Sequence, residues 1–197
     1  MVKELKEIEL IVDNEETDLI SAMGFVQSPA IRQPLVYFNE KNNYVFANVD
    51  SEKGIIVSPA LIPEKRIFRY DPFLNEEYYV YFSRETIEKL SQNFIISGYH
   101  NNSTEQHIKP ISGVHLIYSW IVENQHDPLI TKYGYKQIPN GTWAVMYKIN
   151  NEDIKEKIKS GEINGLSVEA WITEKYDNRS SNDDKLLDEI KKIIEEN

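Results

Sequence analysis

The composition of this chain restricts which side chains could act as a covalent nucleophile. The 197 residues include no cysteine, which excludes thiol catalysis, disulfides and cysteine-ligated zinc. A covalent nucleophile must therefore be an oxygen or an amine, supplied by serine, threonine, lysine or a carboxylate.

Metal and nucleotide chemistry have no local support in the sequence. The four histidines, His100, His107, His115 and His126, do not stand in the HExxH spacing that binds zinc on a helix. Among the 8 glycines there is neither a GxGxxG nor a GxxxxGK[ST] pattern to cradle a phosphate. We therefore expect no cofactor and no metal.

Acyl transfer remains, and it needs a hydroxyl, an imidazole within reach, and a group that orients the imidazole. The segment Gly165–Ile172 alternates, so Ser167, Glu169 and Trp171 share one side of a predicted strand. Glu169 stands where a GxSxG nucleophile elbow has its second glycine, which disfavours an α/β-hydrolase. Because a serine on the polar side of a strand usually has no catalytic role, residue types alone leave a hydrolase and a strand-rich binding module both open.

The elements that must position these residues are mostly short strands. Runs of residues with high β-propensity, bounded by turn-forming residues, predict strands in the first half of the chain. They are Glu7–Val12, Val36–Phe38, Tyr44–Val49, Ile55–Val57, Arg66–Tyr70 and Tyr78–Phe82. The last of these is aromatic on both sides and is expected to be central. A helix should follow, capped by Ser83 and ended by Gly98.

The second half continues the same mixture. An Asn-rich loop, Gly98–Ser112, carries His100 and His107. The remaining predicted elements are strands Gly113–Glu123, Thr142–Ile149 and Gly165–Thr173, and a helix from Asn151 to Ser160 that Gly161 ends. The pattern indicates a strand-rich, mixed α/β fold without regular βαβ units. His115, Trp120 and Trp143 are expected to be structural.

Charge and hydropathy restrict the partners. The net charge of -10 argues against nucleic-acid binding, and no apolar run approaches the roughly 20 residues that cross a bilayer. Residues 1–174 are expected to form one domain, followed at 175–197 by a polar linker and an amphipathic helix. The apolar stripe of that helix consists of Leu186, Leu187, Ile190, Ile193 and Ile194. It predicts either docking onto the body or a partner-binding tail, self-association included.

A series of short motifs in a shared order resembles the XkdF-like serine proteases of tailed phages, a branch of the prohead proteases. They are Ala60–Pro63, Ile67–Tyr70, Tyr78–Ser83, Glu85–Ile87, Glu105–His107, Ser119–Glu123, Gly141–Trp143 and Gly165–Glu169. Weaker agreement around Phe25–Val26 and Ser28–Ala30 extends the resemblance towards the N-terminus.

The resemblance implies a fold like that of the herpesvirus assembly proteases: a β-barrel-like core of mostly antiparallel strands flanked by a few helices. It makes Ser167 the nucleophile on a strand and His107 its general base. The third catalytic residue is open between Glu169 and Glu123. Glu169 is slightly preferred, because it shares the Ser167 side about 7 Å along the strand. Ala170 departs from the glycine expected after the glutamate.

The implied activity is that of a capsid-maturation endopeptidase, which cleaves scaffold, the major head protein and itself through an acyl-enzyme. It would act inside the procapsid, in the cytoplasm of the bacterial host, without nucleic acid or membrane as partner. The alternative is a catalytically inactive homologue that serves as an internal capsid or scaffold-associated structural protein.

Overall fold

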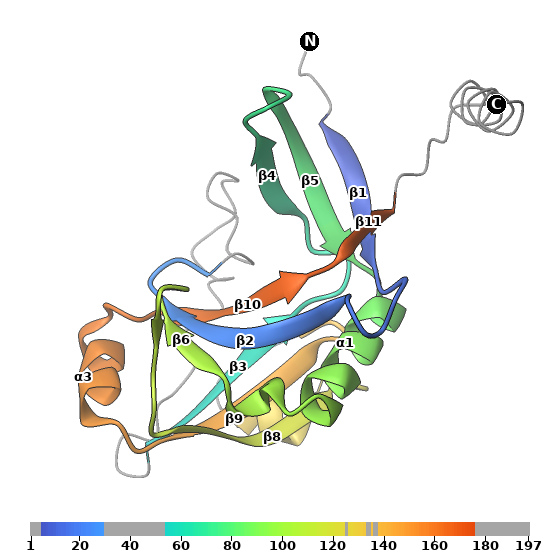
Figure 1. Cartoon of the computed structure of the whole chain (residues 1–197). Coiled ribbons are helices and arrows are strands. Elements are labelled where there is room, and N and C mark those ends of the chain that lie inside the picture. Colours follow the sequence, from blue (N-terminus) through green and yellow to red (C-terminus); the bar gives the residue numbers. More distant parts are fainter. Residues whose placement is uncertain (1–4, 30–53, 125, 133–134, 136–137, 176–197) are drawn as a thin grey trace, which may run out of the picture.

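The described part of the chain folds into three β-sheets with helices at their margins (Figure 1). The computed structural model describes residues 5–29, 54–124, 126–132, 135 and 138–175. The predicted strand-rich, mixed α/β class is confirmed. Across these described ranges, however, the sheets do not join into a closed barrel, so the barrel-like part of the expectation does not hold.

The first sheet stands apart from the other two (Figure 1). Its strand order is β11 (Thr173–Lys175), β1 (Lys6–Ile11), β5 (Glu76–Phe82) and β4 (Ile67–Asp71). Strands β1 and β5 are parallel, and the other neighbours are antiparallel. The prediction that Tyr78–Phe82 is central is confirmed, because β5 lies between β1 and β4.

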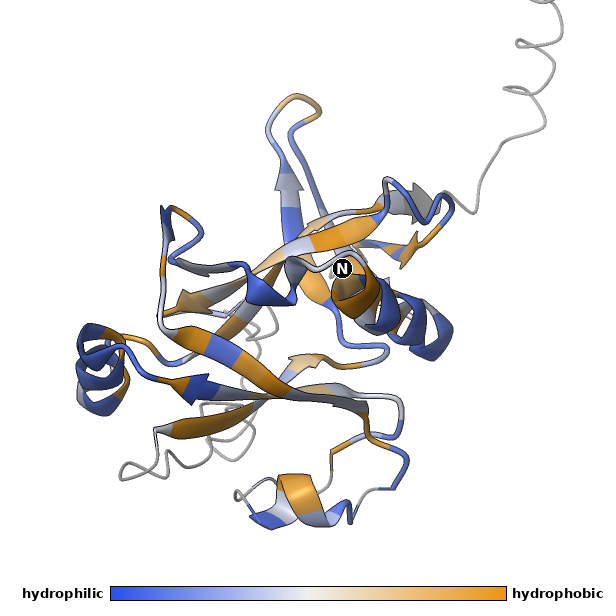
Figure 2. Cartoon of the chain, turned by 60° about the horizontal axis from the view of Figure 1, so that its bottom comes forward, coloured by the Kyte–Doolittle hydropathy of each residue, from blue (hydrophilic) through white to orange (hydrophobic). Residues whose placement is uncertain are grey.

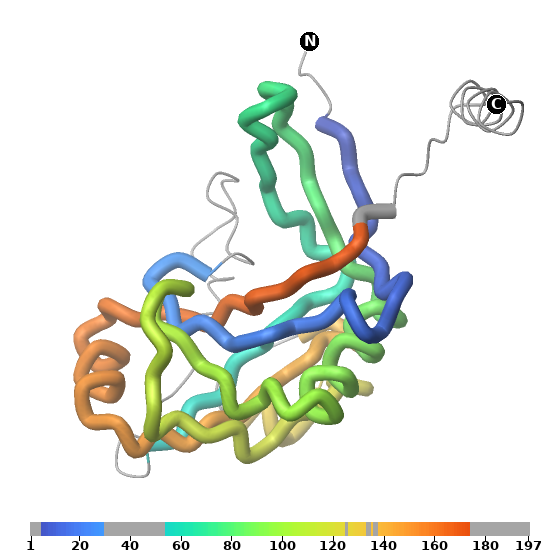
Figure 3. Tube along the Cα trace, in the orientation of Figure 1, coloured from blue at the N-terminus to red at the C-terminus, as the bar shows by residue number. Residues whose placement is uncertain are grey.

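The second sheet carries the candidate nucleophile and the third sheet supports it. The second has the order β10 (Gly165–Trp171), β2 (Leu19–Val26), β6 (Ser103–Glu105) and β7 (Lys109–Pro110). The third has the order β3 (Ile55–Leu61), β9 (Trp143–Ile149) and β8 (Val114–Ile121). Figure 3 shows β2 and β10 running side by side along the middle of the molecule.

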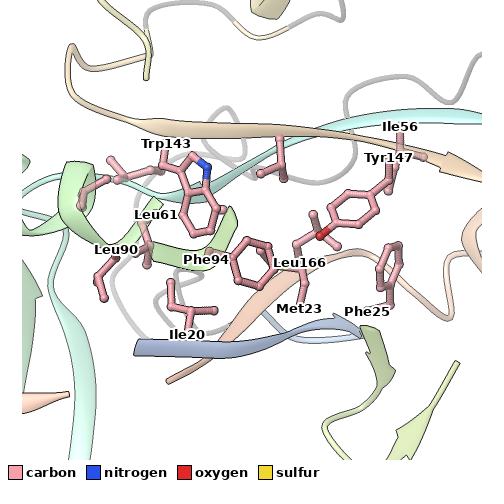
Figure 4. Close-up of a cluster of buried hydrophobic side chains, with 14 of the residues drawn as sticks. Ile20, Met23, Phe25, Ile56, Leu61, Leu90, Phe94, Trp143, Tyr147 and Leu166 are labelled. Atoms are coloured by element: carbon pink, nitrogen blue, oxygen red, sulfur yellow. The ribbon is translucent and has the colours of Figure 1, made fainter. Parts of the chain in front are cut away.

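The main core fills the space between β2 and β9 (Figure 4). Phe25 of β2 packs edge-to-face on Tyr147 of β9, with ring centroids 5.5 Å apart. Trp143 packs in the same way on Phe94 of the covering helix, also at 5.5 Å, and its indole donates to Ser119 Oγ at 2.9 Å. The expectation that Trp143 is a core residue is confirmed. This packing fixes the position of β2 relative to the third sheet.

Two helices begin and end as predicted. Helix α1 (Arg84–Ile96) is capped by Ser83, whose hydroxyl accepts from the Thr86 backbone N–H. Helix α3 (Glu152–Ser160) is capped by Asn151 and ends at Gly161, which adopts the left-handed conformation with φ of 79°. The described residues also form the short helices η2 (Tyr99–Asn101) and α2 (Pro128–Lys132). Helix α1 buries Ile87, Leu90 and Phe94 in the main core. The β4–β5 hairpin, by contrast, ends in an exposed hydrophobic tip (Figure 2).

The loop expected at Gly98–Ser112 is more ordered than predicted. It contains η2, β6 and β7, and β6 pairs in parallel with β2. The strand β2 itself was not predicted. Pairing between β2 and β6 joins residues about eighty positions apart, and such long-range contacts have no local sequence signature.

Some predicted elements lie outside the described residues. They are the strands Val36–Phe38 and Tyr44–Val49, and the C-terminal linker and helix expected at 175–197, except for Lys175, which is the last residue of β11. Within the part that is described, no helix has the length and apolar character needed to cross a bilayer.

Candidate active site

The site is built on a row of three residues that crosses the second sheet. Gly24 in β2 is the register partner of Ser167 in β10 on one side and of Thr104 in β6 on the other. Side chains at paired positions point to the same side of a sheet. Ser167 and Thr104 therefore face the same side, separated by a glycine that has no side chain.

This side of the sheet is the one turned away from the main core. Leu166 is buried in the core, as are Met23 and Phe25 of β2 (Figure 4). Because side chains alternate along a strand, Ser167 and Glu169 point to the opposite side. Glu169 pairs with Ala22, as Ser167 pairs with Gly24. These two small residues of β2 leave space beside the side chains of Ser167 and Glu169.

His107 reaches the same space from a tight turn between β6 and β7. The Ile108 N–H donates to the Glu105 carbonyl at 3.0 Å, and the two residues between them, Gln106 and His107, have φ of 53° and 59°. Positive φ at both central positions is the mark of a type I′ turn, which favours glycine, asparagine or aspartate. Each such residue costs about 1 kcal/mol or more, and strain of this kind concentrates at functional sites.

Neighbouring elements hold the turn in place. The Gln106 N–H donates to the Phe25 carbonyl at 3.0 Å, and Gln106 Oε1 accepts from the Gln27 N–H at 3.2 Å. On the other side, Lys157 of α3 contacts Glu105 Oε1 at 2.6 Å. The hydrogen bond to Glu105, aided by Asp153, raises the pKa of Lys157 above its ordinary value, so the lysine stays charged.

The imidazole of His107 contacts the carboxylate of Glu169. Nδ1 of His107 lies 3.0 Å from Oε1 of Glu169, and both side chains are partly exposed, at 38% and 27%. The Thr104 hydroxyl donates to the same carboxylate oxygen. A carboxylate held by a second donor in this way can fix the orientation and the tautomer of an imidazole.

The imidazole reaches Glu169 by crossing above Gly24. A methyl group on Gly24 would lie 2.5 Å from Cε1, 2.7 Å from Nδ1 and 3.2 Å from Nε2 of His107. Three adjacent strands span about 9.6 Å from the first to the third. The missing side chain on the middle strand is what lets a residue at the β6 side touch a residue on β10.

Ser167 lies beneath this pair and borders a cavity. Only 6% of its surface is exposed, and it contributes to the wall of a cavity of about 190 Å³. Among the described residues, no hydrogen bond joins Ser167 to His107. Glu169 contacts Nδ1 of the imidazole, so Nε2 is the ring nitrogen that this carboxylate does not contact.

The other candidate residues lie in different surroundings. Glu123, the alternative third residue, contacts Arg84 Nη2 at 2.7 Å on the exposed surface. His115 is exposed on β8 and His100 contacts its neighbour Asn101. In the ranges that the structure covers, no group of three or more histidine, aspartate or glutamate side chains could hold a metal ion.

Sequence reasoning missed Gly24 and Thr104. An isolated glycine in the apolar run of Leu19–Val26 is a known signal of close approach by another group, and it was available in the sequence. Thr104 had no such signal, because its partner Glu169 is 65 residues away.

The family model described as "Putative phage serine protease XkdF" matches residues 66–176, which is more than half of the chain. The chain belongs to this family of phage serine proteases. Neither a curated protein nor a solved structure matches it.

The family match bears directly on the site. It includes His107, Ser167 and Glu169 together with Glu123, and it begins at β4. The middle strand β2, with Gly24, lies before the matched region. The candidate site therefore includes a strand that lies outside the region that the family model matches.

Proposed function

We propose that this protein is a serine endopeptidase that uses Ser167 as nucleophile, His107 as general base and Glu169 as the residue that orients the base. The observation that carries the proposal is the 3.0 Å contact between His107 Nδ1 and Glu169 Oε1, made directly above the register partner of Ser167. Family membership supports the same reaction class.

The arrangement assigns each ring nitrogen of His107 a different task. Nδ1–H donates to Glu169, which leaves the lone pair of Nε2 to accept the proton of Ser167 Oγ. Oγ then attacks the carbonyl carbon of the scissile peptide bond. Glu169 stabilises the imidazolium that forms, because it places a negative charge beside the newly positive ring.

His107 then returns the proton that it has accepted, first to the leaving group and later to Ser167. His107 Nε2–H protonates the leaving amine, the C–N bond breaks, and the acyl group remains on Ser167 Oγ. In the second half, His107 takes a proton from water, the resulting hydroxide attacks the ester, and Oγ recovers its proton as the carboxylic acid product leaves. Because the direct His107–Ser167 hydrogen bond is not made in the free chain, substrate binding must shorten this contact.

The biological substrates that we propose are the scaffold and major head proteins of a phage procapsid, and the protease itself. The family consists of phage serine proteases, which supports action within the infected bacterial host. Cleavage inside a closed procapsid would explain why the nucleophile is nearly covered, because a protease assembled among its own substrates needs restraint before maturation.

Covalent labelling is the direct test of this proposal. A fluorophosphonate should label the full-length protein at one serine, found as Ser167 by peptide mass spectrometry, and the Ser167→Ala variant should not be labelled. The His107→Gln variant should label far more slowly, because it lacks the base. Labelling that persists in Ser167→Ala, or no labelling of the parent protein, would disprove the assignment.

A catalytically silent structural homologue is the second candidate, and two observations favour it. Ser167 is 6% exposed, and Ala170 stands where glycine was expected. A silent homologue would bind to scaffold without forming an acyl-enzyme. Retained scaffold binding together with failure of the parent protein to react with the fluorophosphonate would support this reading.

A further inference from the structure

The cavity that borders Ser167 has a definite chemical character. It lies between β10 and the first sheet, and its walls include Leu61, Val80, Phe82, Val168 and Ala170. Among the described residues that line it, one side chain is charged, that of the exposed Arg69. The lining side chains other than Arg69 and Ser167 are apolar, which favours an uncharged, apolar guest over a charged one.

The size of the cavity restricts the guest further. Its volume is about 190 Å³, whereas a cavity of about 150 Å³ lined by aliphatic and aromatic side chains holds a benzene molecule. Leucine, methionine and phenylalanine side chains therefore fit. Alanine would leave most of the space unfilled, and the lost apolar contact would weaken its binding.

The position of β10 explains how a polypeptide would present such a side chain. Within the described residues β10 is the outermost strand of its sheet, paired with β2 on one side only. An extended peptide can lie along such an edge, and its alternate side chains then point to the same side. The side chains of Val168 and Ala170 alternate with that of Ser167 and line the cavity. In a peptide paired along this edge, the residue opposite Ser167 shares the side of Ser167, and the residues before and after it point to the cavity side.

We infer that this cavity is the specificity pocket of the protease and that it selects substrates with leucine, methionine or phenylalanine beside the scissile bond. The inference rests on the proposed function, since it needs Ser167 to be the nucleophile. Ala170 is the residue that sets the depth of the pocket from the exposed side, because it lines the cavity and is itself solvent-exposed.

The test uses the full-length protein and a peptide library of mixed sequence, with cleaved bonds identified by mass spectrometry. Three proteins are compared: the parent, Ala170→Leu, and His115→Leu as a matched control that adds the same side chain at an exposed strand position in another sheet. Ala170→Leu tests the pocket without burying a larger residue in the core, so the fold should be retained.

The parent should cleave mainly at bonds flanked at one position by leucine, methionine or phenylalanine. Ala170→Leu should shift that preference towards alanine and glycine by roughly tenfold or more, since a single methylene changes discrimination by about that factor. His115→Leu should keep the parental preference. Ser167-dependent cleavage with no apolar preference, or one that Ala170→Leu leaves unchanged, would overturn the inference while the proposed function stands. Absence of Ser167-dependent cleavage would overturn both.

Discussion

The imidazole of His107 lies directly above Gly24, so close that a methyl group there would be 2.5 Å from Cε1 of the ring. Gly24 has no positive φ that would require glycine for backbone reasons. The residue is therefore needed for space. Its position between Thr104 and Ser167 in the register makes it the point over which the proposed catalytic contact is made.

Gly24→Ala should displace His107 and lower kcat/KM by about 100-fold, because a shift of about 1 Å in a catalytic group has that effect. Gly165→Ala is the matched control. It is equally crowded, but its new methyl group would meet Pro29 at 2.7 Å and not the histidine. Peptide hydrolysis by both variants, with circular dichroism to check the fold, measures the difference. Equal activity in Gly24→Ala and the parent would contradict the role given to His107.

Glu169→Gln should lower turnover by roughly 10³- to 10⁴-fold, because an amide can donate to Nδ1 and select the wrong imidazole tautomer. Glu123→Gln should cleave at the parental rate, since Glu123 contacts Arg84 on the surface. Steady-state kinetics on one peptide substrate compare the two. If both variants cleave normally, a serine–histidine pair without a carboxylate is the better description.

Thr104→Val should lower kcat by about tenfold, because Glu169 loses a hydrogen bond worth about 1.5 kcal/mol or more while the shape of the side chain is kept. Thr104→Ser retains the hydroxyl and should recover most of the activity. Thr104 acts through Glu169, so KM should change little in either variant. A purely structural role would instead reduce stability in both and leave kcat of the folded protein intact.

Asp18, just before β2, accepts a hydrogen bond from Thr173, which follows β10. From this contact we expect the stability of the fold to depend on pH. Burial alone would raise the pKa of Asp18, but hydrogen bonds from the Asn14 and Asp13 backbone and from Thr173 outweigh it and lower the pKa. The folded-state pKa is thus below the unfolded value of about 3.9. The ionised Asp18 therefore stabilises the folded state at pH values above its unfolded-state pKa, and this stabilisation is lost as pH falls through the folded-state pKa.

Asp18→Asn should therefore reduce the free energy of unfolding by about 2 kcal/mol at pH 7, the scale of a hydrogen bond to a charged group. The difference from the parent should shrink as pH falls well below 4. Urea titrations at several pH values test this, with the exposed neighbour Asp13→Asn as control. A difference that is constant across this pH range would show that ionisation of Asp18 does not contribute.

Truncation after Tyr176 tests the proposed tail, which lies outside the described residues. This cut leaves β11 intact, and β11 pairs with β1 through Thr173–Lys175. We expect cleavage of short peptides to be retained and processing of assembled scaffold to fall, because a scaffold-binding tail raises the local substrate concentration. Loss of solubility or of both activities would show that the helix completes the fold.

Local signals in the sequence were enough to predict the strands around β1, β4, β5, β8, β9 and β10 and the helices α1 and α3. Hydrophobic period and capping chemistry are properties of neighbouring residues, as the caps Ser83 and Asn151 show. Alternation in the same way placed Ser167 and Glu169 on one side of a strand.

Other features were decided only by tertiary structure. Nothing near Glu169 or Glu123 in sequence tells which one meets His107, because the contact depends on where the β6–β7 turn lies relative to β10. That position results from the pairing of β6 with β2 and of β2 with β10. Strand pairing between distant segments is a collective outcome of packing and hydrogen bonding, so the row of Thr104, Gly24 and Ser167 exists only once the sheet has formed.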